Sequence, residues 1–266
     1  MLTYILDGKT SSIEKTLTSL GYKHFEYLES SSSTLVASVY HAQDQRVIKI
    51  VKSSSQELQI LQQVGGKNRI IQLLNSVPIT IPNMSNDYVL LEMSYKINQQ
   101  IKSGEELKIF SRQLIEIMLF LHDNGVYYRD FKPGNIRWDG NNLTLIDFNC
   151  SMLYKDAADY PTRSCVGTKG FMAPEVLDRE KFSDIRADIW NIGILIGYEW
   201  LQLYRGICAA ESILTCSCEN IISEFQSILD APILVDLLTK MLQKDPNLRI
   251  NAKKLLEHPY FIPKVS

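Results

Sequence analysis

The chain has 266 residues, of which 45% are hydrophobic and 22% are charged, and its formal net charge is -2. This is the composition of an ordinary globular protein, and the length suits one domain of two lobes or two small domains. The near-neutral charge gives no general attraction to nucleic acid or acidic lipid, so neither is expected as a partner. The most apolar stretch, residues 189–204, contains Asn191 and Glu199 and is too short to span a bilayer.

The five cysteines do not form a disulfide or metal framework. They are odd in number, and no histidine lies at ligand spacing from the close pair Cys216 and Cys218. We therefore expect reduced thiols and an intracellular location. Residues 1–15 lack a basic stretch followed by an apolar core, so no signal peptide is expected.

Two short helices are expected in the first third of the chain. Ser11 and Glu14 have the spacing of a capping box, which predicts a helix that ends near Gly21. The serines at 53–55 can cap a second helix, whose apolar positions lie between residues 57 and 64. The two glycines that follow would end that helix.

The rest of this region predicts β-strands, because short apolar runs are bounded by turn residues. Asp44-Gln45 is expected at the tip of a hairpin, and Pro78 in the connection between two later strands. The five predicted strands cover residues 25–28, 35–41, 46–51, 70–74 and 88–93.

After residue 93 the hydrophobic period becomes helical. Apolar residues recur three and four positions apart over residues 105–122, which predicts an amphipathic helix. A β-rich first third and a helical remainder predict an α+β fold with two lobes and a cleft between them. The small lobe is expected over residues 1–93 and the larger one over residues 94–266. Further helices are predicted over 184–203, 218–229, 231–243 and 252–256.

Two polar segments, residues 128–135 and 145–149, are separated by one predicted hairpin. Asp130 lies on the first segment, Asn135 follows in the same loop, and Asp147 leaves the next strand. One carboxylate can then lie beside an incoming hydroxyl, while the amide and the second carboxylate hold Mg²⁺ on a nucleotide's phosphates. The alternative is a pair of acidic turns on a surface hairpin.

These segments resemble the catalytic loop and the metal-binding triplet of the eukaryotic protein kinase family. The resemblance covers roughly residues 25–262 and implies the bilobal protein-kinase fold, with ATP and Mg²⁺ as cofactors. It implies that Asp130 is the catalytic base and that Asn135 and Asp147 bind the metal. Lys132 beside Asp130 is typical of the serine/threonine branch, where its ammonium neutralises the transferring phosphoryl group. The implied activity is transfer of the γ-phosphoryl of ATP to Ser and Thr hydroxyls of protein substrates.

The N-terminal third also resembles this family. Lys49, on the strand that carries Val47, matches the lysine that reaches the α- and β-phosphates, and Glu57 matches its partner on the following helix. The short stretch between Lys49 and Glu57 requires a short helix with the glutamate near its start. Leu91 matches the gatekeeper of the nucleotide pocket, and the backbone from Glu92 to Ser94 is expected to bind adenine.

Three residues match structural positions of the larger lobe. Asp188 matches an aspartate that ties down the backbone of the catalytic loop. Glu175 lies in an Ala-Pro-Glu triplet that resembles the end of an activation segment, and Arg249 matches the arginine that pairs with it.

The chain departs from the family at the phosphate loop. Ser32, Thr34 and Ala37 stand where the three glycines of that loop would be, and glycine lets backbone amides approach phosphates most closely. The departure supports a second reading, a pseudokinase that serves as a scaffold or allosteric partner. Retention of the lysine and the catalytic-loop residues favours the active enzyme. A small-molecule kinase is a third reading, against which Glu175 and Arg249 argue.

Two other substitutions lie beside the catalytic residues. Asn149 replaces the glycine of the metal-binding triplet, and asparagine tolerates positive φ better than most residues. Tyr128 replaces the commoner histidine of the catalytic loop, and its ring is expected to pack under Phe148.

Regulation by phosphorylation is suggested by Arg129, which precedes Asp130. A phosphate on Ser164, or on the nearby Thr162, would pair with Arg129 and order the activation segment. The alternative is a solvated loop serine, and Met152 stands where a second basic residue is often found. The resemblance leaves open whether an activating subunit is needed.

Substrate choice is suggested by Lys169, which would face the residue just beyond the acceptor, and by Gly134, where basophilic kinases carry an acid. Both features indicate acidic residues after the target. Residues 167–177 and 37–40 are similar to the cell-division-cycle kinase that fires replication origins, and residues 56–61 to casein kinase 2. Both of these subgroups are acid-directed, and the first suggests a cell-cycle role.

Overall fold

The chain forms two compact units in the computed structural model. One comprises Met1–Lys67 and Ile71–Lys96, and the other comprises Asn68–Ile70 and Ile97–Ser266. The sequence-based boundary between residues 93 and 94 stays a prediction. The structure describes residues 10–30, 35–41, 44–80, 88–154, 164–178, 183–217 and 220–262.

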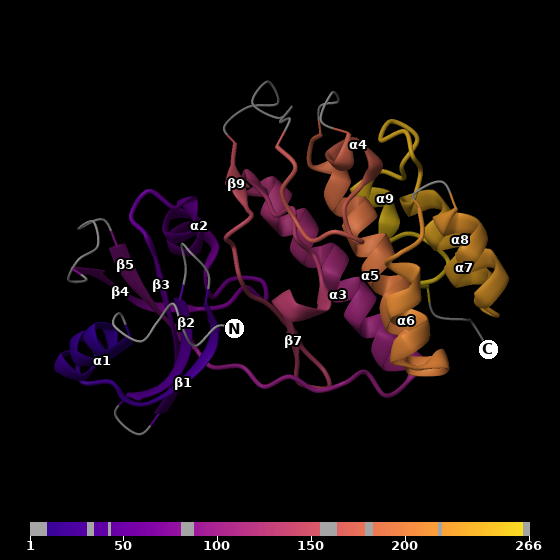
Figure 1. Ribbon diagram of the computed structural model, residues 1–266. Coiled ribbons are helices and arrows are strands. Elements are labelled where there is room, and N and C mark those ends of the chain that lie inside the picture. The colour runs from indigo at the N-terminus through magenta and orange to yellow at the C-terminus, as the bar shows by residue number, and fades with distance from the viewer. Residues whose placement is uncertain are drawn as a thin grey trace. The chain divides into compact units, whose positions relative to one another are not determined.

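The first unit is a five-stranded antiparallel sheet with two helices beside it (Figure 1). The strand order is β1-β2-β3-β5-β4, so that β4 is an edge strand. The strands are β1 (Lys23–Ser30), β2 (Leu35–His41), β3 (Asp44–Lys52), β4 (Leu73–Ile79) and β5 (Tyr88–Ser94), and the helices are α1 (Thr10–Ser19) and α2 (Gln56–Val64).

Two sequence-based assignments in this unit are wrong. Asp44 and Gln45 belong to β3, paired with His41 and Tyr40, so they are not the hairpin tip. The fourth strand runs over Leu73–Ile79 and includes Pro78, which was expected in a connection. Proline is tolerated there because β4 lies at the sheet edge, where a missing N–H need not break the ladder.

The caps of α2 agree with the sequence-based prediction. The Ser55 side chain accepts a hydrogen bond from the amide of Glu57, and Gly65 is the C-cap residue, donating its amide to the Leu61 carbonyl. Helix α1 begins at Thr10, so Ser11 lies inside its first turn rather than before it.

The tripeptide Asn68–Ile70 belongs to the second unit although its chain neighbours belong to the first. The Asn68 amide donates to the Glu116 carbonyl at 3.2 Å, and the Arg69 guanidinium contacts the Glu116 carboxylate at 3.1 Å. The Arg69 carbonyl accepts from the amide of Leu145 at 2.9 Å, and Ile70 bridges to Leu145. These contacts explain why residues 70–72 do not begin β4.

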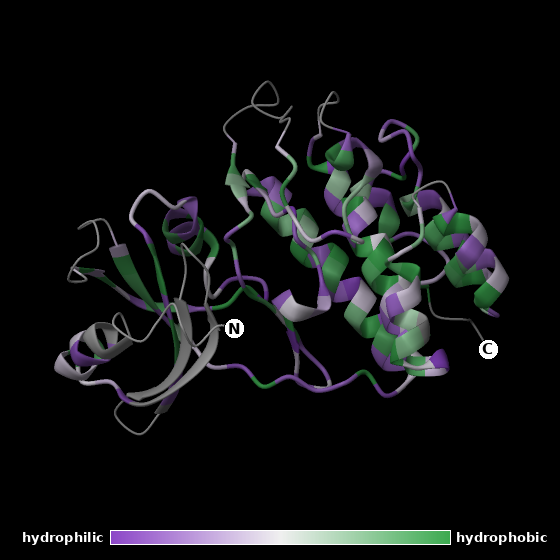
Figure 2. Cartoon of the chain, viewed as in Figure 1, coloured by the Kyte–Doolittle hydropathy of each residue, from purple (hydrophilic) through white to green (hydrophobic). Residues whose placement is uncertain are grey.

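The second unit is mainly helical, with α3 and α5 packed against each other at its centre (Figure 1). Helix α5 is buried on all sides over most of its length, and its colour in Figure 2 is mixed because polar residues such as Asp188 and Asn191 are buried along with the apolar ones. A Cβ at Gly197 would lie 2.3 Å from the Phe225 ring, so glycine permits the close approach of α7 to α5. The long helices are α3 (Gly104–Asp123), α5 (Arg186–Arg205), α7 (Ile221–Ile228) and α8 (Pro232–Met241).

The smaller elements of this unit position the candidate site. Two short ribbons pair β6 with β9 and β7 with β8, and a 3₁₀ turn lies between β6 and β7. The helices α4 and α6 were not predicted from the sequence, and Gly206, at φ 87°, separates α5 from α6. The elements are β6 (Val126–Tyr127), η1 (Pro133–Asn135), β7 (Ile136–Trp138), β8 (Leu143–Leu145), β9 (Met152–Leu153), α4 (Pro174–Leu177), α6 (Ile207–Ile213) and α9 (Ala252–Leu255).

No helix in the described parts of the chain is long and apolar enough to cross a membrane.

Candidate active site

Lys49 and Glu57 form a buried ion pair in the first unit. The Lys49 Nζ lies 2.7 Å from Glu57 Oε1, and the two side chains are 3% and 1% exposed. The pair forms because Glu57 is the second residue of α2, directly after the Ser55 cap. The short helix with an early glutamate is therefore what the sequence predicted. Burial of both charges is tolerated because each partner compensates the other.

The residues expected to contact adenine lie at the end of β5. Leu91 is fully buried opposite Lys49 in the sheet register, Glu92 is buried opposite Ile48, and Ser94 is half-buried. Val47 on β3 is half-buried and pairs with Met93.

The expected phosphate loop is only partly described. Ser32 and Thr34 lie outside the described residues. Ala37 lies in β2, where its backbone pairs with Tyr27 on one side and Ile48 on the other.

Asp130 is held by two residues of its own loop. The Asn135 amide donates to Asp130 Oδ2 at 2.9 Å and to the Asp130 carbonyl at 3.0 Å. The Lys132 ammonium lies 3.0 Å from Asp130 Oδ2. The other carboxylate oxygen, Oδ1, is buried and has no hydrogen-bond partner in the described part of the chain. A buried acceptor without a donor is costly, so this atom is the natural acceptor for a substrate hydroxyl.

Lys132 also contacts the segment that precedes α4. Its ammonium donates to Thr168 Oγ1 at 2.8 Å, so one cation bridges the Asp130 carboxylate and the predicted activation segment. Thr168 was part of a motif quoted from the sequence but was not assigned this role.

Asn135 and Asp147 are brought together by the β7–β8 ribbon. The amide of Ile146 donates to the Asn135 carbonyl at 2.9 Å, one residue before Asp147. The Asn135 side-chain nitrogen donates to Asp130, and the oxygen of the same amide is an acceptor. One carboxylate and one amide oxygen are the donors that Mg²⁺ prefers, and its remaining positions take water and phosphate oxygens. The two residues therefore fit the predicted metal.

The described part of the chain contains no cation site built from protein ligands alone. Among the described residues there is no cluster of three or more His, Cys, Asp or Glu side chains that could hold a metal ion.

Asp188 anchors the backbone of the catalytic loop. Its fully buried carboxylate accepts the amides of Arg129 at 2.8 Å and Tyr128 at 3.1 Å, and it contacts His122 Nε2 at 2.9 Å. Arg129 has φ 71°, a conformation that costs a non-glycine residue free energy. The two hydrogen bonds from backbone amides to the Asp188 carboxylate stabilise that turn, and the turn orients Asp130.

Tyr128 packs as the sequence predicted. Its ring lies edge-on to Phe148, with centroids 5.2 Å apart, and its hydroxyl donates to the Ile146 carbonyl at 2.6 Å. Burial, with the nearby Asp147 and Asp130 carboxylates, raises the pKa of Tyr128 well above its ordinary value. The phenol therefore stays neutral and supports the strand that leads to Asp147.

Arg129 contacts the proposed phosphorylation site. Its Nη1 donates to Ser164 Oγ at 2.8 Å and its Nε to the Cys150 carbonyl at 2.5 Å, while the guanidinium lies over the Tyr127 ring at 5.7 Å. Burial lowers the pKa of Arg129. Thr162 lies outside the described residues.

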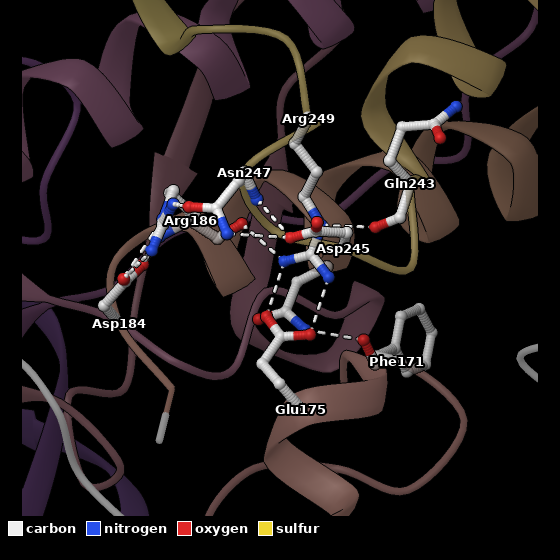
Figure 3. A network of polar contacts seen from close by, with 9 residues as sticks. Phe171, Glu175, Asp184, Arg186, Gln243, Asp245, Asn247 and Arg249 are labelled. Carbon is white, nitrogen blue, oxygen red and sulfur yellow. Dashed lines mark hydrogen bonds and ion pairs between the residues drawn. The ribbon is translucent and has the colours of Figure 1, made fainter. Parts of the chain in front are cut away.

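Glu175 and Arg249 form a two-point ion pair in the core of the second unit (Figure 3). The Arg249 nitrogens lie 2.5 and 2.6 Å from the two carboxylate oxygens. Arg249 also donates to the carbonyls of Gln243 and Arg186. This pair joins the start of α4 to the segment before α9, as the sequence predicted.

The pair belongs to a wider network that sequence reasoning missed. Arg186 contacts both oxygens of Asp184 and donates to Asn247 at 2.6 Å (Figure 3). Burial would raise the pKa of Asp184, but the hydrogen bonds from Arg186 outweigh it and the pKa is lowered. The i, i+2 spacing of Asp184 and Arg186 just before a helix was the available signal.

Comparison with known proteins identifies the family. Residues 24–261 match the model of the protein kinase domain. The chain is 31% identical over 178 residues to maternal embryonic leucine zipper kinase of Xenopus laevis, which covers 63% of this chain and 26% of that protein. It is 29% identical over 231 residues to the liver/testis phosphorylase b kinase gamma catalytic chain of Rattus norvegicus. This match covers 79% of this chain and 54% of that protein.

A third relative is CBL-interacting protein kinase 11 of Oryza sativa subsp. japonica, 28% identical over 234 residues, which cover 80% of this chain and 43% of that protein. The chain thus spans between about a quarter and about half of the length of these curated relatives. The expected α+β kinase fold is confirmed by the family match over residues 24–261 and by the mixed strands and helices. The chain belongs to the protein kinase domain family.

Proposed function

We propose that the chain is a protein serine/threonine kinase that transfers the γ-phosphoryl of ATP to protein hydroxyls. The observation that carries the proposal is the state of Asp130, whose Oδ2 is held by Asn135 and Lys132 while Oδ1 has no donor among the described residues. A carboxylate fixed in this way can accept a proton from a Ser or Thr hydroxyl. The names of the relatives, all protein kinases, also support it.

The other residues take roles that follow from their contacts. Lys132 neutralises charge on the phosphoryl group and, through Thr168, ties the catalytic loop to the activation segment. Asn135 and Asp147 hold Mg²⁺, which neutralises charge on the phosphates when it is bound. Lys49, oriented by Glu57, binds phosphate oxygens as a cation.

Active enzyme is favoured over the pseudokinase alternative for the same reason. The Lys49–Glu57 ion pair and the Asp130–Lys132 ion pair are both formed. If one partner of such a pair were lost, the remaining buried charge would destabilise the fold, so the complete charged set of an active kinase is present. Phosphoryl transfer depends mainly on positioning and charge neutralisation by such groups.

The finer proposal is a preference for acidic residues after the target hydroxyl. Lys169 is exposed and directly follows Thr168, which Lys132 holds beside the catalytic carboxylate. Gly134 is also exposed and adds no charge to the same loop. An acid-directed cell-cycle kinase, similar to the origin-firing kinase or casein kinase 2, remains the proposed subgroup. An activating subunit and an intracellular location are proposals from the sequence alone.

One transfer assay tests the main and the finer proposal together. The parent chain and Asp130→Asn are incubated with γ-labelled ATP, Mg²⁺ and matched peptides that carry Asp or Arg after the same serine. We expect labelling by the parent only, with a drop of at least about 10²-fold in the variant, because general-base catalysis contributes that much. Tight ATP binding by the parent without transfer would favour the pseudokinase, and faster labelling of the Arg peptide would reject the acid preference.

A further inference from the structure

Helix α1 ends in a motif that brings two side chains together. Gly21 has φ 89°, its amide donates to the Thr18 carbonyl at 3.0 Å, and the amide of Tyr22 donates to the Leu17 carbonyl at 3.1 Å. These two bonds define the Schellman ending, in which the residue after the glycine packs against the residue five positions before it. Leu17 is fully buried and Tyr22 is 3% exposed. The helix end therefore presents Leu17 and Tyr22 as one apolar contact.

This contact covers one face of the five-stranded sheet. Leu17 and Tyr22 share a buried cluster with alternate residues of β3 and β5, which include Ile48, Ile50 and Leu90. Side chains alternate between the two faces of a sheet, so Lys49 and Leu91 lie on the opposite face. The match to the family model begins at residue 24, so Leu17 and Tyr22 lie outside the residues that it covers.

Tyr22 also makes a polar contact at the end of β5. Its hydroxyl donates to Glu92 Oε2 at 3.0 Å, and Arg46 Nε lies 3.7 Å from Glu92 Oε1. Burial, followed by the hydrogen bond to Glu92, raises the pKa of the Tyr22 phenol, so it is a protonated donor at neutral pH. Glu92 is only 5% exposed, and a carboxylate at that depth is stable only when donors reach it.

We propose that Tyr22 is a positioning residue for nucleotide binding. By holding the Glu92 side chain, it fixes the last residues of β5, Glu92 to Ser94, whose backbone groups are the proposed adenine contact. Glu92 to Ser94 are the last paired residues of the ladder with β3, which ends at Arg46–Ser94, so the Tyr22–Glu92 contact adds a side-chain tether at the end of that ladder. This inference rests on the proposed kinase function, but it concerns a segment that the family match does not include.

The test uses the whole chain and Tyr22→Phe, which removes one oxygen and keeps the ring in the cluster. We expect the ATP Kd and KM to rise about 3- to 10-fold with kcat changed less than about 2-fold, since a hydrogen bond to a charged group is lost while Asp130 and its partners are untouched. The variant Glu92→Leu, which has no acceptor for the Tyr22 hydroxyl, should weaken ATP binding similarly. The double variant should be no weaker than either single one, because both remove the same contact.

Leu17→Ala and Leu20→Ala form a matched pair on the same helix end. Leu17 is fully buried and Leu20 is 37% exposed, so only Leu17→Ala should weaken ATP binding and lower the thermal midpoint, by roughly 4–10 °C. Leu20→Ala should resemble the parent.

Each result decides the proposal. A lower thermal midpoint of Tyr22→Phe with unchanged ATP affinity would show that Tyr22 only stabilises the fold and would overturn the positioning role. Additive effects in the double variant would also overturn it. If the parent binds no ATP, the kinase function itself fails and this role fails with it. If the parent binds ATP and Tyr22→Phe binds it with the same affinity, only the positioning role of Tyr22 is rejected.

Discussion

Two arginines of the helical unit, the buried Arg249 and the half-buried Arg129, are held in different ways. Arg249 meets the Glu175 carboxylate at two points, donates to two backbone carbonyls and lies over the Trp190 ring at 5.3 Å. Arg129 contacts a carbonyl, the Ser164 hydroxyl and the Tyr127 ring. Among the described residues, none of the hydrogen-bond acceptors of the Arg129 guanidinium is a carboxylate.

The difference indicates two roles for one residue type. An arginine whose charge and fork geometry are matched by a carboxylate has no reason to exchange partners, and it joins two segments permanently. An arginine that is half-buried among neutral acceptors keeps a charge that no carboxylate contacts directly. Such a site stabilises an incoming anion, and a phosphate on a neighbouring hydroxyl is the anion that regulation can supply.

The largest effect is expected when the matched arginine is removed. Arg249→Ala leaves the Glu175 carboxylate buried without its partner, which should lower the free energy of unfolding by about 3–5 kcal/mol. Arg249→Lys should recover only part of this loss, because an ammonium cannot make the two-point contact. Chemical denaturation measures the stability of both variants. Arg112→Ala is the control, because the exposed Arg112–Glu116 ion pair contributes at most about 1 kcal/mol. An Arg249→Ala chain as stable as the control would contradict the structural role.

Much of the fold and site followed from local patterns. The hairpin around Asp139 and the caps of α2 depend on residues a few positions apart, so the sequence predicts them well. The pairs Lys49–Glu57 and Glu175–Arg249 followed from resemblance to the kinase family, not from periodicity. Glu175 and Arg249 are 74 positions apart, and Lys49 and Glu57, although only 8 apart, lie on a strand and a helix, so no local rule gives either pair.

Two of the misses have the same physical cause. The start of β4 was placed too early because Ile70 reads as a strand residue, whereas Ile70 belongs to the helical unit and its backbone partner there is Leu145. Tyr22 was overlooked because its acceptor, Glu92, lies 70 positions away. Long-range contacts of this kind override local preference, and a single sequence does not reveal them.

Glu199 is the acidic equivalent of Arg129, because no cation contacts its carboxylate among the described residues. Glu199 on α5 has no hydrogen bond or ion pair among the described residues, and burial raises its pKa from 4.5 to about 7. At pH values between these two pKa values, the folded chain binds more protons than the unfolded chain. The free energy of unfolding therefore falls as the pH rises. Glu199→Gln should remove that slope. We expect a gain of about 2 kcal/mol at pH 8 and little change at pH 4.5, measured by denaturation at several pH values.

The control for Glu199 is an exposed glutamate nearby. Glu211 on α6 is exposed and, like Glu199, influences the Tyr198 phenol, so Glu211→Gln changes the same local charge without relieving burial. Its stability should follow that of the parent at every pH. Parallel pH profiles for Glu199→Gln and the parent would show that the buried carboxylate is compensated after all.

The smallest expected effect tests whether Arg129 receives an anion. Ser164→Asp places a carboxylate where the hydroxyl now meets Arg129 Nη1, and it should raise kcat/KM of the dephosphorylated chain several-fold, about 1 kcal/mol in the barrier. Ser164→Ala should lose the activation that phosphorylation gives the parent, whereas Thr162→Ala should keep it. The gain of Ser164→Asp should also disappear in an Arg129→Gln background, because its receptor is gone. Activity of Ser164→Ala equal to that of the phosphorylated parent would remove this switch and leave Arg129 a structural residue like Arg249.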